Sequence, residues 1–219
     1  MAFVFAHGAF SFSPEHAGEV SERYLGLCAC LFATPEYNRM CQKLRRGPVG
    51  EFSKEAIRGP ITESSFFVVG AVVDKLQLHI GNPKTNFYLA ALSAVATPIC
   101  EYVISARSLG VLYMGSREKS RHQAAFETIR RDGDRARKGD FFQRNLLRLH
   151  FRSTDRWPGL KLAETLAPSV TAAILADRLA EGDYSSWVSS PSRHLADLVK
   201  TKWLSNEIMG PQYGRILVE

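Results

Sequence analysis

The sequence has few cysteines and lacks the common signatures of catalytic and cofactor-binding sites. Four cysteines lie in apolar surroundings at uneven spacing, which predicts buried free thiols in a reducing compartment rather than disulfides: Cys28, Cys30, Cys41 and Cys100. No Cys/His pairs have zinc-site spacing, and the histidines form neither H-x-x-x-H nor H-E-x-x-H. A Walker loop, a G-x-S-x-G elbow and a Rossmann fingerprint are also missing. The sequence therefore carries no signal for a structural zinc site, a P-loop, a serine-hydrolase elbow or a dinucleotide site.

The chain also lacks an uninterrupted apolar run of membrane-spanning length. Its first ten residues, MAFVFAHGAF, contain no basic region followed by an apolar core. The most apolar later stretch, 87–104, is broken by Thr97, Pro98 and Glu101. We expect no membrane association and a cytoplasmic location.

Positive charge is concentrated in one part of the sequence. The formal net charge is +6, and residues 107–156 hold 13 lysines and arginines against 6 aspartates and glutamates, while the rest of the chain is nearly balanced. A local excess of this kind attracts polyanions and predicts nucleic acid as a partner. The alternative is a solvated helix face whose charges pair locally, as Arg130, Arg131, Asp132 and Asp134 could.

The pattern of apolar residues predicts an α/β domain. With 219 residues and 45% apolar content, the chain is long enough to bury a core. The runs typical of strands lie at 3–6, 24–32, 64–74, 109–115 and 146–153. The segments typical of helices lie at 34–46, 86–107, 117–133 and 159–179, with a last helix after Ser192 that carries Trp203. Pro98 is expected to kink or break its helix. Gly70 is expected to mark either a close approach of another segment or a β-bulge, and 210–219 to lie outside the core.

The strand, helix and strand between Leu109 and Arg152 form a predicted βαβ unit. Such a unit requires parallel pairing and places chemistry at the carboxyl ends of its strands. Here those ends carry Gly115, Ser116 and Arg117, and the helix after Arg152 carries Lys161 and Glu164. The first two strands are expected to pair antiparallel because a turn-rich segment joins them.

Three segments resemble a known family: MGSREKSRHQAAFETIRRDG, FFQRNLLRLHFRS and PGLKLAETLAPSV. They are similar to the C-terminal half of the DUF3800 family, a ribonuclease-H-like group with an E-S-R after a strand and a G-L-Q-L-A-D opening a helix. FFVVGAVVDK and FVFAHGAFSFSP resemble that family's middle and opening strands. The resemblance implies a single ribonuclease-H-like domain over 1–185, with a mixed central sheet flanked by helices and a C-terminal helical extension over 186–219.

The acidic positions of the family are mostly replaced in this sequence. The opening acidic pair corresponds to Ala6 and His7, the glutamate of E-S-R to Gly115, and the aspartate of L-A-D to Glu164. A loop motif of the family corresponds to FSKEAIR, which retains Glu55. Mg²⁺ prefers oxygen ligands, and neither alanine nor glycine has a side-chain oxygen. The resemblance therefore implies no cofactor, or Mg²⁺ held weakly by Glu164 and Glu55.

The sequence thus predicts a nucleic-acid-binding protein with impaired or absent metal-dependent phosphodiester cleavage. The residues expected to contact phosphate are Ser116, Arg117, Lys161, Arg121, Arg130, Arg131, Arg135, Arg137 and Lys138. One alternative is an active Mg²⁺-dependent nuclease with an unorthodox site of Glu164, Glu55 and His7. Another is a non-catalytic assembly subunit that forms homo-oligomers or binds a protein partner through its apolar last helix.

Overall fold

The computed structural model describes residues 2–7, 23–46, 58–81, 84, 86–115, 119–136, 146–153, 157–178, 199–204 and 214–218. The backbone alone is described for 2–7, 44–46, 58, 60–61, 121, 133–136, 146–148, 176–178 and 215. These residues form an α/β fold with a six-stranded mixed sheet flanked by helices, in the order β5-β4-β1-β2-β3-β6. The strands are β1 (Ala2–His7), β2 (Tyr24–Ala33), β3 (Phe67–Asp74), β4 (Gly110–Gly115), β5 (Leu146–Arg152) and β6 (Arg215–Val218). The helices are α2 (Thr34–Arg46), α3 (Arg58–Glu63), α4 (Lys75–Gly81), α5 (Phe87–Ser105), α6 (Lys119–Ala136) and α8 (Pro158–Arg178).

The first three strands form an antiparallel meander. β1 pairs with β2 from Ala2↔Ala33 to His7↔Cys28, and β2 pairs with β3 from Tyr24↔Asp74 to Leu31↔Phe67. β3 is the β-branched run FVVGAVVD, and all of its residues after Phe67 are buried. The predicted antiparallel start of the chain is confirmed.

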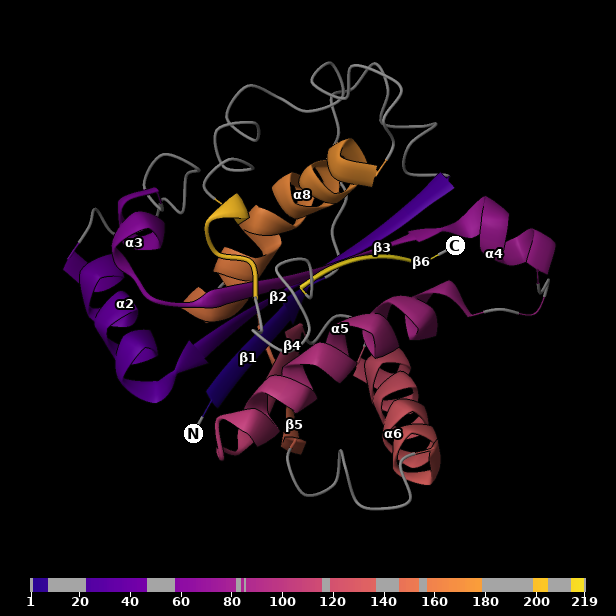
Figure 1. Ribbon diagram of the computed structural model, residues 1–219. Helices are drawn as coiled ribbons and strands as arrows, with labels where there is room; N and C mark the ends of the chain where they lie inside the picture. The colour runs from indigo at the N-terminus through magenta and orange to yellow at the C-terminus, as the bar shows by residue number, and fades with distance from the viewer. Residues whose placement is uncertain are drawn as a thin grey trace.

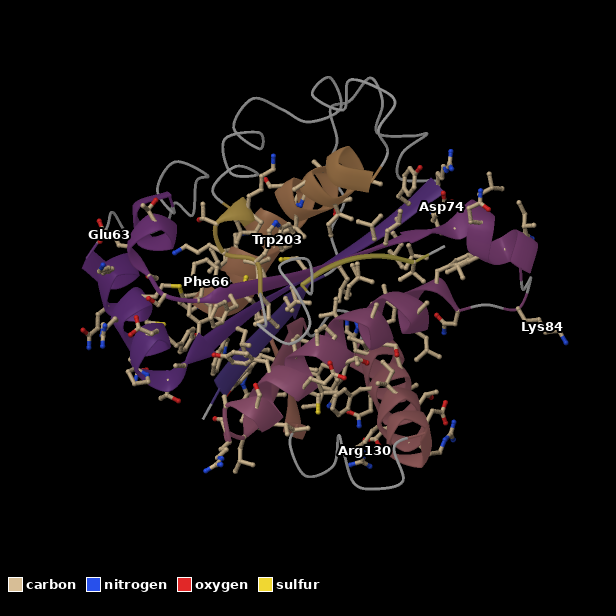
Figure 2. The ribbon with its side chains drawn as sticks, viewed as in Figure 1. Glu63, Phe66, Asp74, Lys84, Arg130 and Trp203 are labelled. Atoms are coloured by element: carbon tan, nitrogen blue, oxygen red, sulfur yellow. The ribbon has the colours of Figure 1, made fainter. Side chains whose placement is uncertain are left out.

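The predicted βαβ unit is also confirmed. β4 pairs parallel with β1 on one side and with β5 on the other, and α6 connects β4 to β5 in sequence. Because β1, β3, β4 and β5 run in the same direction, their carboxyl ends lie at one edge of the sheet. We call this the carboxyl edge and the opposite one the amino edge. Figure 2 shows Asp74 and Phe66 at the two ends of β3, one at each edge.

Helices cover the two faces of the sheet. Figure 1 shows α8 on one face and α5 with α6 on the other. Leu160, Leu166 and Val170 of α8 pack on Cys28 and Phe32 of the sheet. The opposite face buries one side of α5 and of α6, including Leu92, Ile99, Phe126 and Ile129. The alternation of side chains along each strand supplies both cores from the same sheet.

Glycines allow α8 to lie close to the sheet. A Cβ at Gly70 would lie 2.3 Å from Val170 Cγ1, and one at Gly26 would lie 2.1 Å from Thr171 Oγ1. The predicted close approach at Gly70 is therefore confirmed, and it identifies α8 as the element that approaches.

Helix α5 is the longest apolar segment among the described residues. Its length and composition alone would allow it to cross a membrane, but half of its most apolar window is buried inside the protein, as in a core helix. It begins after Asn86, whose side chain accepts a hydrogen bond from the Leu89 N–H at 3.1 Å. It continues through Pro98 to Ser105, so the predicted break at this proline does not occur.

The carboxyl-terminal part of the chain differs from the sequence prediction. The segment 210–219 was expected to lie outside the core, but residues 215–218 form β6 and extend the sheet parallel to β3. Trp203, expected on a helix, forms a parallel β-bridge with Val68. Val199, Trp203 and Leu204 are all buried within the chain. These three side chains are therefore not the exposed apolar surface that the assembly alternative requires.

The cysteines follow the sequence prediction. All four are free, and Cys28, Cys30 and Cys100 are buried. Cys28 and Cys30 face the same core, beneath α8. Burial raises the pKa of the Cys30 thiol, and the neighbouring Cys28 raises it further. A thiol in this environment stays protonated and unreactive.

Candidate nucleic-acid interface

The carboxyl edge brings together the strand ends that the sequence singles out. Ala6 of β1 pairs with Met114 of β4, so that His7 and Gly115 follow at the ends of neighbouring strands. Gly115 in turn pairs with Arg152 at the end of β5. The positions in β1 and β4 where the family resemblance implies acids are thus adjacent in space, and Gly115 lies beside an arginine.

Two exposed cations lie near this edge, each above an aromatic ring. Lys119, the first residue of α6, has its Nζ 5.8 Å from the centre of the Phe151 ring. The Arg152 guanidinium lies 5.4 Å from the centre of the Trp157 ring, and its Nη1 donates to the Phe151 carbonyl oxygen at 3.2 Å. Neither cation forms an ion pair with another described residue. Both charges are therefore oriented by aromatic contacts without being neutralised.

The cations that the sequence did predict, where their side chains are described, are neutralised locally. Nitrogen–oxygen distances are 2.7 Å for Arg130–Glu127, 3.1 Å for Arg131–Asp132 and 2.7 Å for Lys161–Glu164. These are partly exposed pairs of close sequence neighbours, which contribute little to stability but cancel charge locally. Arg130 and Arg131 are thus paired locally, as the alternative expected, and Lys161 is paired as well; whether these three cations contact phosphate stays a prediction.

The fold also separates these residues. Lys161 belongs to α8 on one face of the sheet, whereas Arg130 and Arg131 belong to α6 on the other. Figure 2 shows Arg130 far along α6 from its start at Lys119. Lys161 therefore does not share a face of the sheet with Arg130 and Arg131, because charge counted along the chain does not report which face each residue occupies.

An aromatic stack supports Arg152 on the α8 side of β4 and β5. The Tyr113 ring lies between the rings of His150 and Trp157, with centroid distances of 5.3 Å and 4.9 Å. His150 is thus packed against Tyr113 in this stack. The stack fixes Trp157 and with it the position of the arginine above that ring.

A histidine and a tyrosine meet on the other side of the same edge. The Tyr88 hydroxyl, at the start of α5, is hydrogen-bonded to Nδ1 of His122 in α6. The His122 ring also lies parallel to the Phe151 ring at a centroid distance of 6.3 Å. Because Lys119 and His122 are one turn apart on α6, these contacts anchor the turn that presents Lys119.

Comparison of the chain with models of protein families gives no match, and comparison with curated proteins gives none.

Several predicted residues lie outside the described part of the structure. These are Glu55, Ser116, Arg117, Arg137 and Lys138. For His7, Arg121 and Arg135 the backbone is described without the side chain. The expected roles of all eight residues stay predictions.

The described side chains contain no cluster suited to a metal ion. No three of the described histidine, cysteine, aspartate and glutamate side chains are placed to share one. Glu164, which the resemblance assigns to a weak Mg²⁺ site, has its Oε2 2.7 Å from the Lys161 ammonium. A carboxylate that shares its charge with an ammonium is a poorer ligand for Mg²⁺. Magnesium binding at Glu164 and Glu55 stays a prediction.

Sequence reasoning missed Lys119 and gave Arg152 no role. A signal was present, because Arg152 directly ends the second strand of the βαβ unit and Lys119 follows the first strand by four residues. Both are therefore placed at the carboxyl edge by topology alone.

Proposed function

We propose that this protein is a ribonuclease-H-like domain that binds nucleic acid through cations at its carboxyl edge, with metal-dependent cleavage impaired or absent. The observation that carries the proposal is the placement of Lys119 and Arg152, two exposed cations without an ion pair among the described residues, near the end of β4 at Gly115. Arginine can contact a phosphate through two N–H groups and lysine as a point charge, and neither requires a metal ion.

The arrangement of strands supports the fold assignment. Five strands follow the order β5-β4-β1-β2-β3, and within them only β2 runs against the others. An antiparallel meander extended on its first strand by a parallel βαβ unit is the arrangement expected of a ribonuclease-H-like sheet. β6 adds a further strand beside β3.

The loss of cleavage follows from the side chains at the same edge. Two-metal phosphodiester hydrolysis requires several carboxylates that converge on the ions. Ala6 and Gly115 occupy two of the strand-end positions and supply no ligand oxygen. Phosphate binding depends on positive charge, so the replacement of acids by Ala6 and Gly115 does not impair it.

The binding prediction is tested with fluorescein-labelled 20-nucleotide single strands and duplexes of DNA and RNA, titrated by anisotropy in EDTA. The double variant Lys119→Ala/Arg152→Ala is expected to bind about tenfold more weakly, because two phosphate contacts are lost. The slope of log affinity against log salt should fall by about 1.4 for single strands or about 1.8 for duplex DNA.

The matched control is Arg130→Ala/Arg131→Ala, which removes the same charge from locally paired arginines. We expect at most about a threefold loss of affinity, since these side chains are already bound to Glu127 and Asp132. Equal losses for the two double variants would mean that binding follows net charge alone and would refute the assigned site. Absence of binding by the unmodified protein at low salt would refute the function.

A second prediction concerns cleavage. The same oligonucleotides, incubated with Mg²⁺ or Mn²⁺ and separated on denaturing gels, are expected to remain intact with both the unmodified protein and Glu164→Gln. Divalent-dependent products that disappear in Glu164→Gln would instead support the active-nuclease alternative, with Glu164 as a metal ligand.

A further inference from the structure

A cavity of about 500 Å³ opens at the amino edge of the sheet, opposite the proposed nucleic-acid interface. Its walls come from the end of β2 and the start of α2, the start of β3, the end of α5 and the segment 201–202. This volume lies within the range of small-molecule binding sites, roughly 300–1,000 Å³. Because the two sites lie at opposite edges, the cavity is independent of the proposed function.

Aromatic rings line the cavity on both sides of the sheet. The rings of Phe32 and Phe66 are stacked with centroids 4.8 Å apart on the α8 side. Phe67 and Tyr102 meet edge to face at 5.2 Å on the α5 side. The consecutive residues Phe66 and Phe67 point to opposite faces, and so the notch at the end of the sheet has an aromatic wall from each core. Phe32 has no exposed surface and Phe66 is only 4% exposed. The partly exposed rings of Phe67 and Tyr102 are therefore the aromatic surface that an occupant can reach, and they favour a flat ring.

The cavity contains one positive charge without an ion-pair partner among the described residues. The Lys202 ammonium donates to the Ser64 carbonyl oxygen at 2.9 Å and lies 5.5 Å from the centre of the Phe66 ring. An ammonium has three N–H donors, and two of them have no acceptor among the residues that the structure describes, which leaves them for a ligand. The other charged residue of the lining, Glu36, is paired with Arg39 at 3.0 Å. Burial raises the pKa of Tyr102, which keeps its hydroxyl neutral at physiological pH.

We propose that this cavity binds a small flat aromatic molecule that carries one anionic group, either a carboxylate or a phosphate monoester. The ring packs on Phe67 and Tyr102, and the anion accepts hydrogen bonds from Lys202. The charge of the site selects against cationic ligands with the same ring, because Lys202 is the unpaired charge.

The proposal is tested by saturation-transfer NMR and calorimetry with three probes. Indole-3-acetate represents the aromatic carboxylates, adenosine 5′-monophosphate the phosphate monoesters, and tryptamine carries the indole ring with a positive charge. We expect at least one anionic probe to bind with Kd below about 1 mM, and tryptamine to bind at least tenfold more weakly. The anionic probe that binds identifies the ligand class. The proposal is overturned if neither anionic probe binds at a concentration of about ten times the expected Kd of 1 mM. It is also overturned if tryptamine binds with the same affinity as the anionic probe.

Two variants assign binding to this cavity. Lys202→Met retains the aliphatic stem and removes the charge, and we expect at least a tenfold loss of affinity for the anionic probe. Ser65→Trp places a large side chain at an exposed position of the lining and should abolish binding while the thermal unfolding midpoint is retained.

The control is Lys200→Met, which removes the same charge from an exposed lysine outside the lining. It should change the affinity by less than twofold. An equal effect of Lys200→Met and Lys202→Met, or unchanged binding in a folded Ser65→Trp variant, would show that the probe binds elsewhere. Oligonucleotide affinity should be unchanged in Ser65→Trp because the proposed interface lies at the other edge.

Discussion

Replacement of Gly70 by valine is expected to lower the free energy of unfolding by about 3 kcal/mol. A Cβ at this position would lie 2.3 Å from Val170 Cγ1 and 2.9 Å from Ile174 Cδ1, well inside van der Waals contact. Both contacts are with α8, so the helix must move away from the sheet or the strand must bend. Interiors packed at crystal density do not absorb such a change without loss. Urea unfolding followed by circular dichroism measures the difference.

Gly81→Val is the matched control, because Gly81 is exposed at the end of α4 and a Cβ there meets no atom of the described residues beyond its own helix and chain neighbours within 4 Å. We expect it to change stability by less than about 1 kcal/mol. A second variant tests the mechanism: in the Gly70→Ala background, Val170→Ala should restore part of the lost stability by removing the nearest clashing atom. Wild-type stability of Gly70→Val would show that α8 does not pack here as described.

Truncation of Leu166 to alanine is expected to cost about 3 kcal/mol, through lost apolar contacts and the cavity left behind. Leu166 has no exposed surface and lies in the centre of the α8 face that packs on the sheet. For a chain of this size, a loss of 3 kcal/mol corresponds to a fall of roughly 6–12 °C in Tm. Differential scanning calorimetry measures this shift directly.

Leu76→Ala removes the same atoms from a leucine of α4 that is 51% exposed. We expect a change within about 0.5 kcal/mol, since little buried contact is lost and alanine favours the helix. A comparable loss in the two leucine variants would contradict the burial of α8.

The main elements could be predicted because their signals are local. The β-branched run of β3, the apolar segment of α5 and the strand-helix-strand pattern of β4, α6 and β5 each report their structure within a few residues. Gly70 inside a strand also indicated a close approach, which the structure attributes to α8. The sequence did not identify α8 as the neighbour, because that contact joins distant segments.

β6 could not be predicted for the same reason. Its four residues, RILV, are too few for a periodic signal, and their strand conformation depends on a partner at Gly70–Val73. The prediction of a helix at Trp203 is wrong for a similar reason. Trp203 forms a β-bridge with the distant residue Val68, and this pairing outweighs the local helical pattern.

The candidate site shows a different limit of prediction from sequence. Counting charges located the basic part of the chain, but did not distinguish arginines held by Glu127 and Asp132 from Lys119 and Arg152, which have no such partner among the described residues. The spacing of Arg130 three residues after Glu127 was compatible with pairing. Only the fold shows that Lys161 lies on the other face of the sheet from α6.

The position of β6 has a consequence for biosynthesis. Ribosomes produce β3 long before β6, yet the two strands are neighbours through Gly70↔Arg215. Until β6 emerges, the nascent domain exposes the outer N–H and C=O groups of a strongly apolar strand, a template on which other chains can assemble. Chaperone protection of this strand would then be needed most during the interval between the translation of its codons and those of its partner.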